Sequence, residues 1–262
     1  MKKIAAIFLL SALPSLALGA EYGEAQDLIG IYGQVVSTPS SLSASDPSGS
    51  LSASGGNTVG GIGIFASAVN RQLWFAHMGF NYSAGAAISG GTITGTSPSG
   101  STSVTGTSSG NGYGMQFNLR LGKLFEVAPQ VAIGPYLAYQ YAKFDAGLNG
   151  EGSARYENNA AGGGVEVTTD LGGPFDFTGH LGYLAGISAS SSANGYGAAN
   201  PPSSGVLQLG VRGVYAFSSH FSAFAGIVYD RYHASYSYVP ASLSVSATVN
   251  EIRGLAGLAY HF

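Results

Sequence analysis

The segment that decides the fold reads YGMQFNLRLGKLF and spans residues 113–125. Apolar side chains fill every second position from Tyr113 to Leu121, and the positions between them carry glycine or polar residues such as Gln116 and Arg120. Successive side chains of a β-strand point to opposite faces, so this two-residue period predicts a strand with one apolar face. Residues 131–141 repeat the pattern.

Ten runs of this kind follow one another along the chain. A tilted strand needs about 9 to 11 residues to cross a bilayer, and each run supplies that length. No apolar stretch beyond residue 20 approaches the roughly 18 continuous residues of a membrane-spanning helix. We therefore predict an all-β fold: a closed antiparallel up-and-down transmembrane β-barrel of ten strands, with eight or twelve as open alternatives. The runs cover residues 27–36, 58–69, 73–88, 112–125, 130–144, 160–171, 175–189, 205–217, 221–236 and 247–262.

The connections between the runs alternate between short and long. Residues 70–72, 172–174 and 218–220 form tight turns, which suit the periplasmic side of a barrel. The long connections are rich in Ser, Gly, Thr or Pro and are expected to be outer loops. They cover residues 37–57, 89–111, 145–159, 190–204 and 237–246.

Composition agrees with a lipid-facing surface. Asp, Glu, Lys and Arg make up only 9% of the residues, whereas Gly occurs 41 times, Tyr 16 times and Phe 13 times. Soluble domains usually carry about 25% charged residues, so a fully water-exposed surface is excluded. The net charge of -3, without a basic cluster, excludes a nucleic-acid partner. The absence of cysteine excludes disulfides and thiol nucleophiles.

The first twenty residues have the pattern of a secretory signal peptide. Lys2 and Lys3 precede an almost wholly apolar run from Ile4 to Leu18, and small residues at Gly19 and Ala20 suit a cleavage site. A retained anchor is less expected, because the apolar run is short for a membrane span of about 20 residues. The predicted domains are a cleaved signal peptide, 1–20, and one barrel domain, 21–262.

The last residues, 254–262, alternate apolar or small side chains and end on Phe262. This ending resembles that of bacterial outer-membrane β-barrels, and the whole mature chain resembles the small OmpA-type and opacity-type barrels. The resemblance implies an integral protein of the bacterial outer membrane, in contact with outer-membrane lipid and lipopolysaccharide. It also implies that Leu258, Tyr260 and Phe262 carry the signal read by the barrel-assembly machinery.

Placing the apolar parity outward puts most mid-strand charges inside the barrel. Unpaired charges in a confined interior cost several kcal/mol, so we expect these side chains to compensate one another, with a bridge between Asp230 and Arg253. A polar lining of a wet pore is the alternative. The predicted lumen network comprises Arg120, Glu166, His180, Arg212, Asp230, Glu251 and Arg253.

Aromatic residues near the strand ends suit the interfacial girdles of a membrane barrel. Phe75 and Phe224 fall on the inward parity, so we expect them to pack inside. The predicted girdle residues include Trp74, Tyr82, Phe125, Tyr141, Phe217, Phe221, Tyr232, Tyr236 and Tyr260.

Catalytic and metal-binding patterns are weak. His233 and Ser235, with Glu251 nearby, resemble the His-x-Ser arrangement of lipid A deacylases, but Tyr236 replaces the asparagine that follows the serine there. The five histidines are too widely spaced to predict a metal site. We expect neither a catalytic residue, a metal nor a cofactor.

Two non-enzymatic functions remain open from the sequence. A barrel of eight strands is filled by side chains, and one of sixteen or more holds an aqueous channel, so ten lies between these cases. Charged partners favour a closed barrel with a structural or surface-interaction role through its outer loops. Inward glycines favour the alternative, a narrow porin for small solutes. A lipid A-modifying hydrolase is the less expected third reading, and we predict that the protein is not an enzyme. The inward glycines are Gly162, Gly164, Gly182, Gly210, Gly226 and Gly257.

Overall fold

The computed structural model describes residues 27–56, 58–97, 100–148, 152–170, 174–193, 196–199, 203–238 and 243–262. The predicted signal peptide, residues 1–20, lies outside the described residues. The strands are β1 (Leu28–Ser37), β2 (Ser40–Asp46), β3 (Gly49–Gly56), β4 (Thr58–Val69), β5 (Trp74–Ser97), β6 (Gly100–Lys123), β7 (Phe125–Ala128), β8 (Val131–Leu148), β9 (Gly152–Asp170), β10 (Phe175–Ala193), β11 (Tyr196–Ala199), β12 (Ser203–Ala216), β13 (Phe221–Tyr238) and β14 (Leu243–His261).

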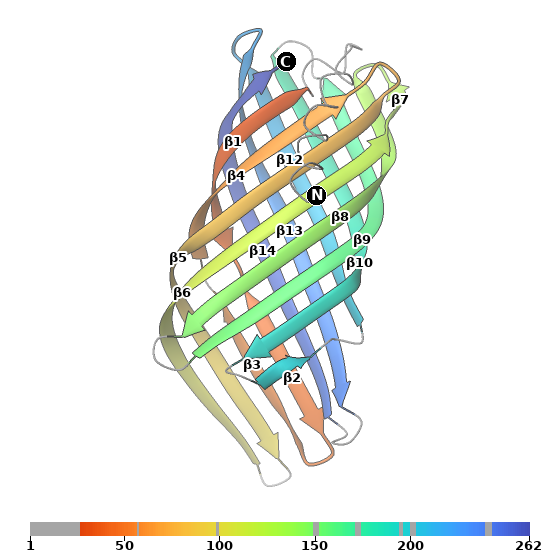
Figure 1. Ribbon diagram of the computed structural model, residues 1–262. Coiled ribbons are helices and arrows are strands. Elements are labelled where there is room, and N and C mark those ends of the chain that lie inside the picture. The colour runs from red at the N-terminus through yellow and green to blue at the C-terminus, as the bar shows by residue number, and fades with distance from the viewer. Residues whose placement is uncertain are drawn as a thin grey trace, which may run out of the picture.

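Ten of these strands close into one antiparallel barrel (Figure 1). Going round the wall, the order is β1, β4, β5, β6, β8, β9, β10, β12, β13 and β14. The ring closes because β1 pairs with β4 on one side and with β14 on the other, with Leu28 opposite His261. The predicted ten-stranded closed barrel is therefore confirmed. In the described part of the chain, no helix is long and apolar enough to cross a membrane.

The wall continues beyond the outer ends of β1 and β4. There the hairpin of β2 and β3 takes the place of these two strands: β2 pairs with residues 244–249 of β14, and β3 pairs with residues 90–96 of β5. Strands β5 and β6 extend together up to the pair Ser97 and Gly100. At the outer end, the β5–β6 hairpin projects past Leu148, the last residue of β8, which pairs with Gly110 (Figure 1).

The prediction of long outer loops is wrong for most of residues 145–159, 190–204 and 237–246, which belong to strands β8 to β14. It is also wrong for most of residues 37–57 and 89–111. These segments form β2, β3 and the outer halves of β5 and β6. Both faces of a strand are wet beyond the lipid, so the apolar alternation stops there while the backbone ladder goes on. A segment rich in Ser, Thr and Gly therefore lacks the alternation by which a strand is predicted from sequence, although backbone hydrogen bonds still stabilise the strand.

The short turns at the other end fix where the strands begin. Between β4 and β5, the Oδ1 atom of Asn70 accepts hydrogen bonds from the backbone N–H groups of Gln72 and Trp74, each at 3.0 Å. Leu73 adopts a positive φ of 62° in this turn. Before β13, the hydroxyl of Ser218 accepts from the N–H of Phe221 at 3.0 Å. These bonds replace the strand ladder where the chain reverses.

Candidate functional site: the filled lumen

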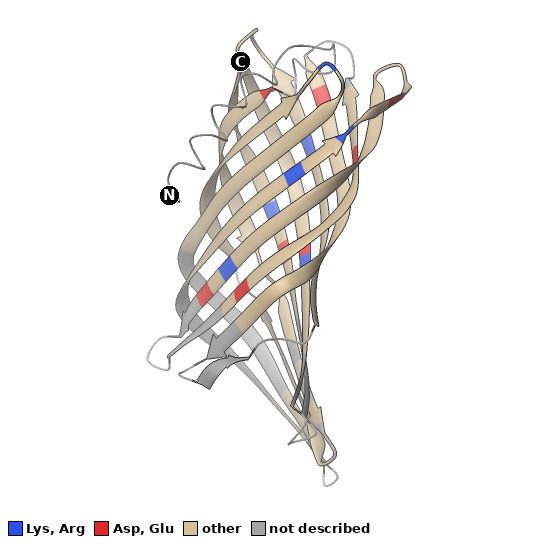
Figure 2. Ribbon diagram, turned by 45° about the vertical axis from the view of Figure 1, so that its right-hand side comes forward, with Lys and Arg blue, Asp and Glu red and all other residues tan. Residues whose placement is uncertain are grey.

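Side chains meet inside the barrel as the strand parity predicts. Phe75 and Phe224, expected to point inward, are 3% and 5% exposed. At mid-depth the lumen holds three guanidinium groups, on Arg120, Arg212 and Arg253, and three carboxylates. The carboxylates belong to Glu166, Asp230 and Glu251, so the formal charges of these six groups cancel. Figure 2 shows how few charged residues the strands carry in all.

The first cluster is centred on Glu166 of β9, which is 1% exposed. Its Oε1 atom lies 2.6 Å from Nε2 of His77 on β5, and its Oε2 atom lies 3.3 Å from Nη1 of Arg120 on β6. The other ring nitrogen of His77, Nδ1, lies 2.8 Å from the hydroxyl of Ser67 on β4. Four strands from two sides of the barrel are thereby joined across the lumen.

The second cluster is centred on Arg253 of β14. Its Nη2 atom donates to Oδ2 of Asp230 on β13 at 2.6 Å, and its Nε atom lies 3.0 Å from Oε1 of Glu251. Gln116 of β6 donates to Oε2 of Glu251 at 2.5 Å, and Gln140 of β8 donates to Oδ2 of Asp230 at 3.3 Å. Both buried carboxylates thus face one cation and one amide.

The structure brings five of the seven predicted network residues into ion pairs: Arg120, Glu166, Asp230, Glu251 and Arg253. The guanidinium of Arg212 lies instead over the ring of Phe65, 5.0 Å from its centroid, where a cation–π contact is expected. The ring of His180 lies against the backbone of Gly210. These two residues line the same lumen without a direct ion pair among the contacts described.

Sequence reasoning missed several members of the network. Gln116 and Gln140 lie at alternating positions already assigned to the inner face, and His77 lies on the same face of its strand as Phe75. The two-residue alternation alone therefore places all three side chains inside. What period does not give is which inward side chains meet, because that depends on the stagger between strands around the ring. Nothing in the sequence around Ser67 indicates that its hydroxyl contacts the network.

Tyr232 is a correction to the predicted aromatic girdle. It is 2% exposed and lies inside, where its hydroxyl accepts hydrogen bonds from Gln116 at 2.8 Å and from Gln140 at 3.1 Å. Its position in β13 is two residues from Asp230, so both share the inward parity, and parity outweighs closeness to a strand end. Tyr236, another predicted girdle residue, has no described side chain.

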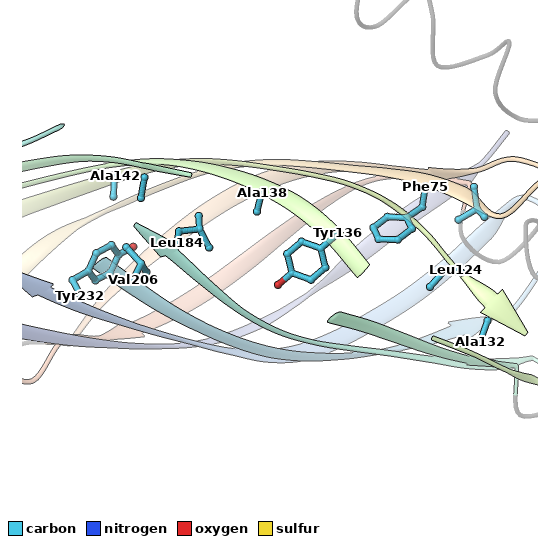
Figure 3. Close-up of a cluster of buried hydrophobic side chains, with 11 residues drawn as sticks. Phe75, Leu124, Ala132, Tyr136, Ala138, Ala142, Leu184, Val206 and Tyr232 are labelled. Carbon is cyan, nitrogen blue, oxygen red and sulfur yellow. The ribbon is translucent and has the colours of Figure 1, made fainter. Parts of the chain in front are cut away.

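Buried apolar side chains lie along the lumen toward both ends of the barrel (Figure 3). Toward the short turns, Phe75 and Leu124 are buried, and the rings of Phe65 and Phe224 meet edge to face at 4.9 Å. Toward the outer end, the ring of Tyr232 meets Phe144 edge to face at 5.5 Å. Leu184 and Val206, both 0% exposed, lie in the same outer layer.

Several of the inward glycines leave room for large side chains. A Cβ atom placed on Gly164 or Gly182 would meet the phenol ring of Tyr136, and one on Gly257 would meet the ring of Phe224 and the backbone of β1. Tyr136 is itself 3% exposed. The space predicted at these positions is thus filled by rings that cross over them.

Outside the ring, large apolar side chains form a belt. Leu137 is 75% exposed, Ile62 69% and Ile31 66%, and the girdle residues Trp74, Phe125 and Phe217 are also exposed. A contiguous apolar surface of this size is unsuited to water. A closed barrel satisfies its own backbone hydrogen bonds, which is what a hydrocarbon environment demands. The belt is therefore a lipid-facing surface.

Comparison with solved structures agrees with this reading. The outer membrane protease OmpT from Escherichia coli is similar in fold, with a TM-score of 0.59 at 13% sequence identity over 90% of this chain and 97% of that one. The chain has the fold of an outer-membrane β-barrel. OprG, an outer membrane protein of Pseudomonas aeruginosa, covers 92% of this chain and 98% of its own at 13% identity, with a TM-score of 0.42. No protein-family model and no curated protein matches the sequence.

The proposed assembly residues lie on the outer, apolar face of the barrel. Leu258 is 56% exposed, Tyr260 41% and Phe262 45%. Tyr260 pairs with Ile29 of β1 and with Phe221 of β13 in the backbone register. The three side chains are therefore accessible from the bilayer, and their role as an assembly signal stays a prediction.

The candidate hydrolase residues do not come together. Glu251 faces the lumen, 2% exposed, whereas His233 lies on the outer face with Nδ1 3.3 Å from the hydroxyl of Thr248. The hydroxyl of Ser235 lies 2.6 Å from that of Ser203. Among the residues that the structure describes, no group of three His, Asp or Glu side chains could hold a metal ion.

Asp27, just before β1, makes the stability of the barrel depend on pH at the end that carries the short turns. Its side chain is 4% exposed, and Oδ1 accepts a hydrogen bond from the N–H of Val69 at 2.7 Å. Burial raises the pKa of Asp27 to about 6, because its effect is larger than that of the hydrogen bond, which lowers the pKa. The folded barrel therefore favours the neutral carboxyl, and stability is lost as the pH rises from about 4 to about 6.

An Asp27→Asn variant tests this linkage, because the amide oxygen can still accept from Val69. We expect the variant to unfold at higher urea than the wild type at pH 8 and at the same urea concentration at pH 3.5. Equilibrium unfolding in lipid vesicles at the two pH values measures the difference. A variant equally or less stable at pH 8 would contradict the raised pKa.

Proposed function

We propose that this outer-membrane protein is a closed barrel with a structural and surface-interaction role, in which the outer hairpins are the working surface. The observation that carries the proposal is the compensated charge network at mid-lumen. Burial of Glu166, Asp230 and Glu251 beside arginines, with buried aromatic rings toward both ends of the lumen, supports a filled lumen rather than an open one.

The proposed partners are outer-membrane lipid and lipopolysaccharide along the belt, and the barrel-assembly machinery at Leu258, Tyr260 and Phe262. Kinship with the OmpA-type or opacity-type barrels stays a prediction. A role other than catalysis is supported by the separation of His233 and Ser235 from Glu251 by the barrel wall. OmpT is a protease by name, but a likeness at 13% identity concerns the fold alone.

A narrow porin is the second candidate. The side chain of Arg120 is 21% exposed although it lies inside the barrel, so some space beside it admits water. If that space joined both ends of the lumen, small solutes could pass along the charged residues. This reading requires the aromatic layers around Phe224 and Tyr232 to move aside.

Single-channel conductance in a planar bilayer separates the two candidates. We expect the refolded wild-type barrel to give no stable channels, and an Arg253→Ala variant to leak because two carboxylates lose their cation and the network loosens. A Lys123→Ala variant is the matched control, since it removes a cation that lies outside the lumen, over the rings of Trp74 and Phe125. Stable wild-type channels would overturn the closed barrel and favour the porin.

A further inference from the structure

The outer half of β6 has a free edge. Strand β6 pairs with β8 only from residue 110 onward, where Gly110 lies opposite Leu148. Residues 101–109 pair with β5 on one side, and no described strand pairs with them on the other. The other edge of the β5–β6 hairpin is covered, because β3 pairs with residues 90–96 of β5. Figure 1 shows this hairpin projecting at the outer end of the barrel.

This edge has none of the features that block strand addition. Unpaired strand edges are templates for another chain, and proteins usually protect them with lysine, proline, bulges or a covering segment. Residues 101–109 read STSVTGTSS, with no charge and no proline. Their register with β5 is also regular throughout, from Ser101 opposite Thr96 to Ser109 opposite Ile88. Nine residues are enough for an added strand of ordinary length.

The sequence of the edge is complementary to itself. An antiparallel partner centred on Thr105 would place Ser101 opposite Ser109 and Ser103 opposite Thr107. Hydroxyl residues already stand opposite one another across the neighbouring strands: the hydroxyls of Thr94 and Ser103 lie 3.3 Å apart, and Ser50 bonds Thr96 in the same way. A copy of β6 would extend these rows and bring no like charges together.

We propose that the edge of β6 at residues 101–109 is a self-association site, to which the same edge of a second copy of this barrel adds in antiparallel fashion. The interface is isologous, with its two-fold axis perpendicular to the sheet. Barrels in one membrane point the same way, so their β6 strands run in the same direction and cannot pair antiparallel. The partner therefore lies in an apposed membrane, and the contact joins two membrane surfaces. This inference deepens the proposed surface role and rests on it.

Cysteine cross-linking tests the register, because the chain has no cysteine of its own. In the proposed pairing, Thr105 lies opposite its own copy, with Cα atoms within the roughly 4.4 to 6.8 Å that a disulfide spans. Oxidation of vesicles carrying Thr105→Cys should give a covalent dimer. Thr92→Cys is the matched control: it lies opposite Thr105 in β5, on the covered strand, and should stay monomeric.

A second pair of variants keeps the test decisive if Thr105→Cys folds poorly. Vesicles with Ser103→Cys should cross-link to vesicles with Thr107→Cys only after the two populations are mixed. Folding of every variant is checked by the shift in gel mobility on heating. Absence of dimers from both designs, with folded protein, would overturn the proposal.

Vesicle aggregation, followed by light scattering, tests the apposed geometry. We expect wild-type proteoliposomes to aggregate and the double variant Ser103→Lys, Thr107→Lys to lose aggregation, because these two positions lie opposite one another across the seam and like charges would face each other there. Thr94→Lys, Thr96→Lys is the control, with the same charges on the adjoining covered strand. Equal loss in both variants, or none in either, would refute self-pairing at β6. The conductance result is independent, so a closed lumen could stand while this inference fails.

Discussion

An Arg253→Met variant is expected to lose about 3 to 5 kcal/mol of the free energy of unfolding, the range for breaking a buried ion pair. Asp230 and Glu251 are 0% and 2% exposed, and both depend on this one guanidinium at 2.6 and 3.0 Å. Methionine preserves much of the side-chain volume. The loss of stability therefore measures the removal of the positive charge rather than the creation of a cavity. Urea unfolding of the barrel in lipid vesicles, followed by tryptophan fluorescence, measures it.

The matched control neutralises the whole cluster. The triple variant Asp230→Asn, Glu251→Gln, Arg253→Met leaves no unpaired charge and should recover most of the loss, because replacing all members of a buried ion group is often close to neutral. A triple variant as unstable as the single one would show that the arginine acts by its shape. A single variant within about 1 kcal/mol of the wild type would mean that water reaches the carboxylates.

Glu166→Gln is expected to have the second largest effect, a loss of about 3 kcal/mol, within the range for one partner removed from a buried pair. The amide can still contact His77, but Arg120 would lose the carboxylate that lies 3.3 Å away. Since Arg120 is partly exposed, water offsets part of the cost and the effect should stay below that of Arg253→Met. The same urea titration compares the two.

Its control is the double variant Glu166→Gln, Arg120→Gln, which removes both charges and should regain stability relative to Glu166→Gln alone. Additive losses in the double variant would indicate that the two residues do not interact. The Arg253 cluster should be unaffected, so its contribution measured in the Glu166→Gln background should equal that in the wild type.

The sequence predicts the strand boundaries within the membrane better than those beyond its outer surface. Thr58 and Val69 were predicted as the ends of one strand and are the ends of β4, and the start of β10 at Phe175 also agrees. The lipid imposes an apolar face there, and that face is what the two-residue period detects. By contrast, β5 continues to Ser97 and β6 begins at Gly100. These outer parts have no apolar face and are defined only by backbone hydrogen bonds.

The lumen shows a similar division. Period places Asp230 and Arg253 on inward faces of neighbouring strands, and their separation of 2.6 Å agrees with the expected pairing. The contact between His77 and Glu166 joins β5 to β9, which lie on different sides of the ring with β6 and β8 between them. A single sequence gives no distance across the lumen, because that depends on how far the strands shift past one another around the closed wall.

The seam between β1 and β14 has a consequence for the order of events in biogenesis. Strand β14, the last of the ring in chain order, hydrogen-bonds to β1, the first, from Leu28 opposite His261 to Ser37 opposite Ile252. Nothing shorter than the whole ring can close, and a chain interrupted before β14 would expose the bare edges of β1 and β13 together. Such a fragment would have two unpaired strand edges, which are sites for aggregation. Pairing of β14 with both β13 and β1 is therefore the step that converts an open sheet into a closed barrel.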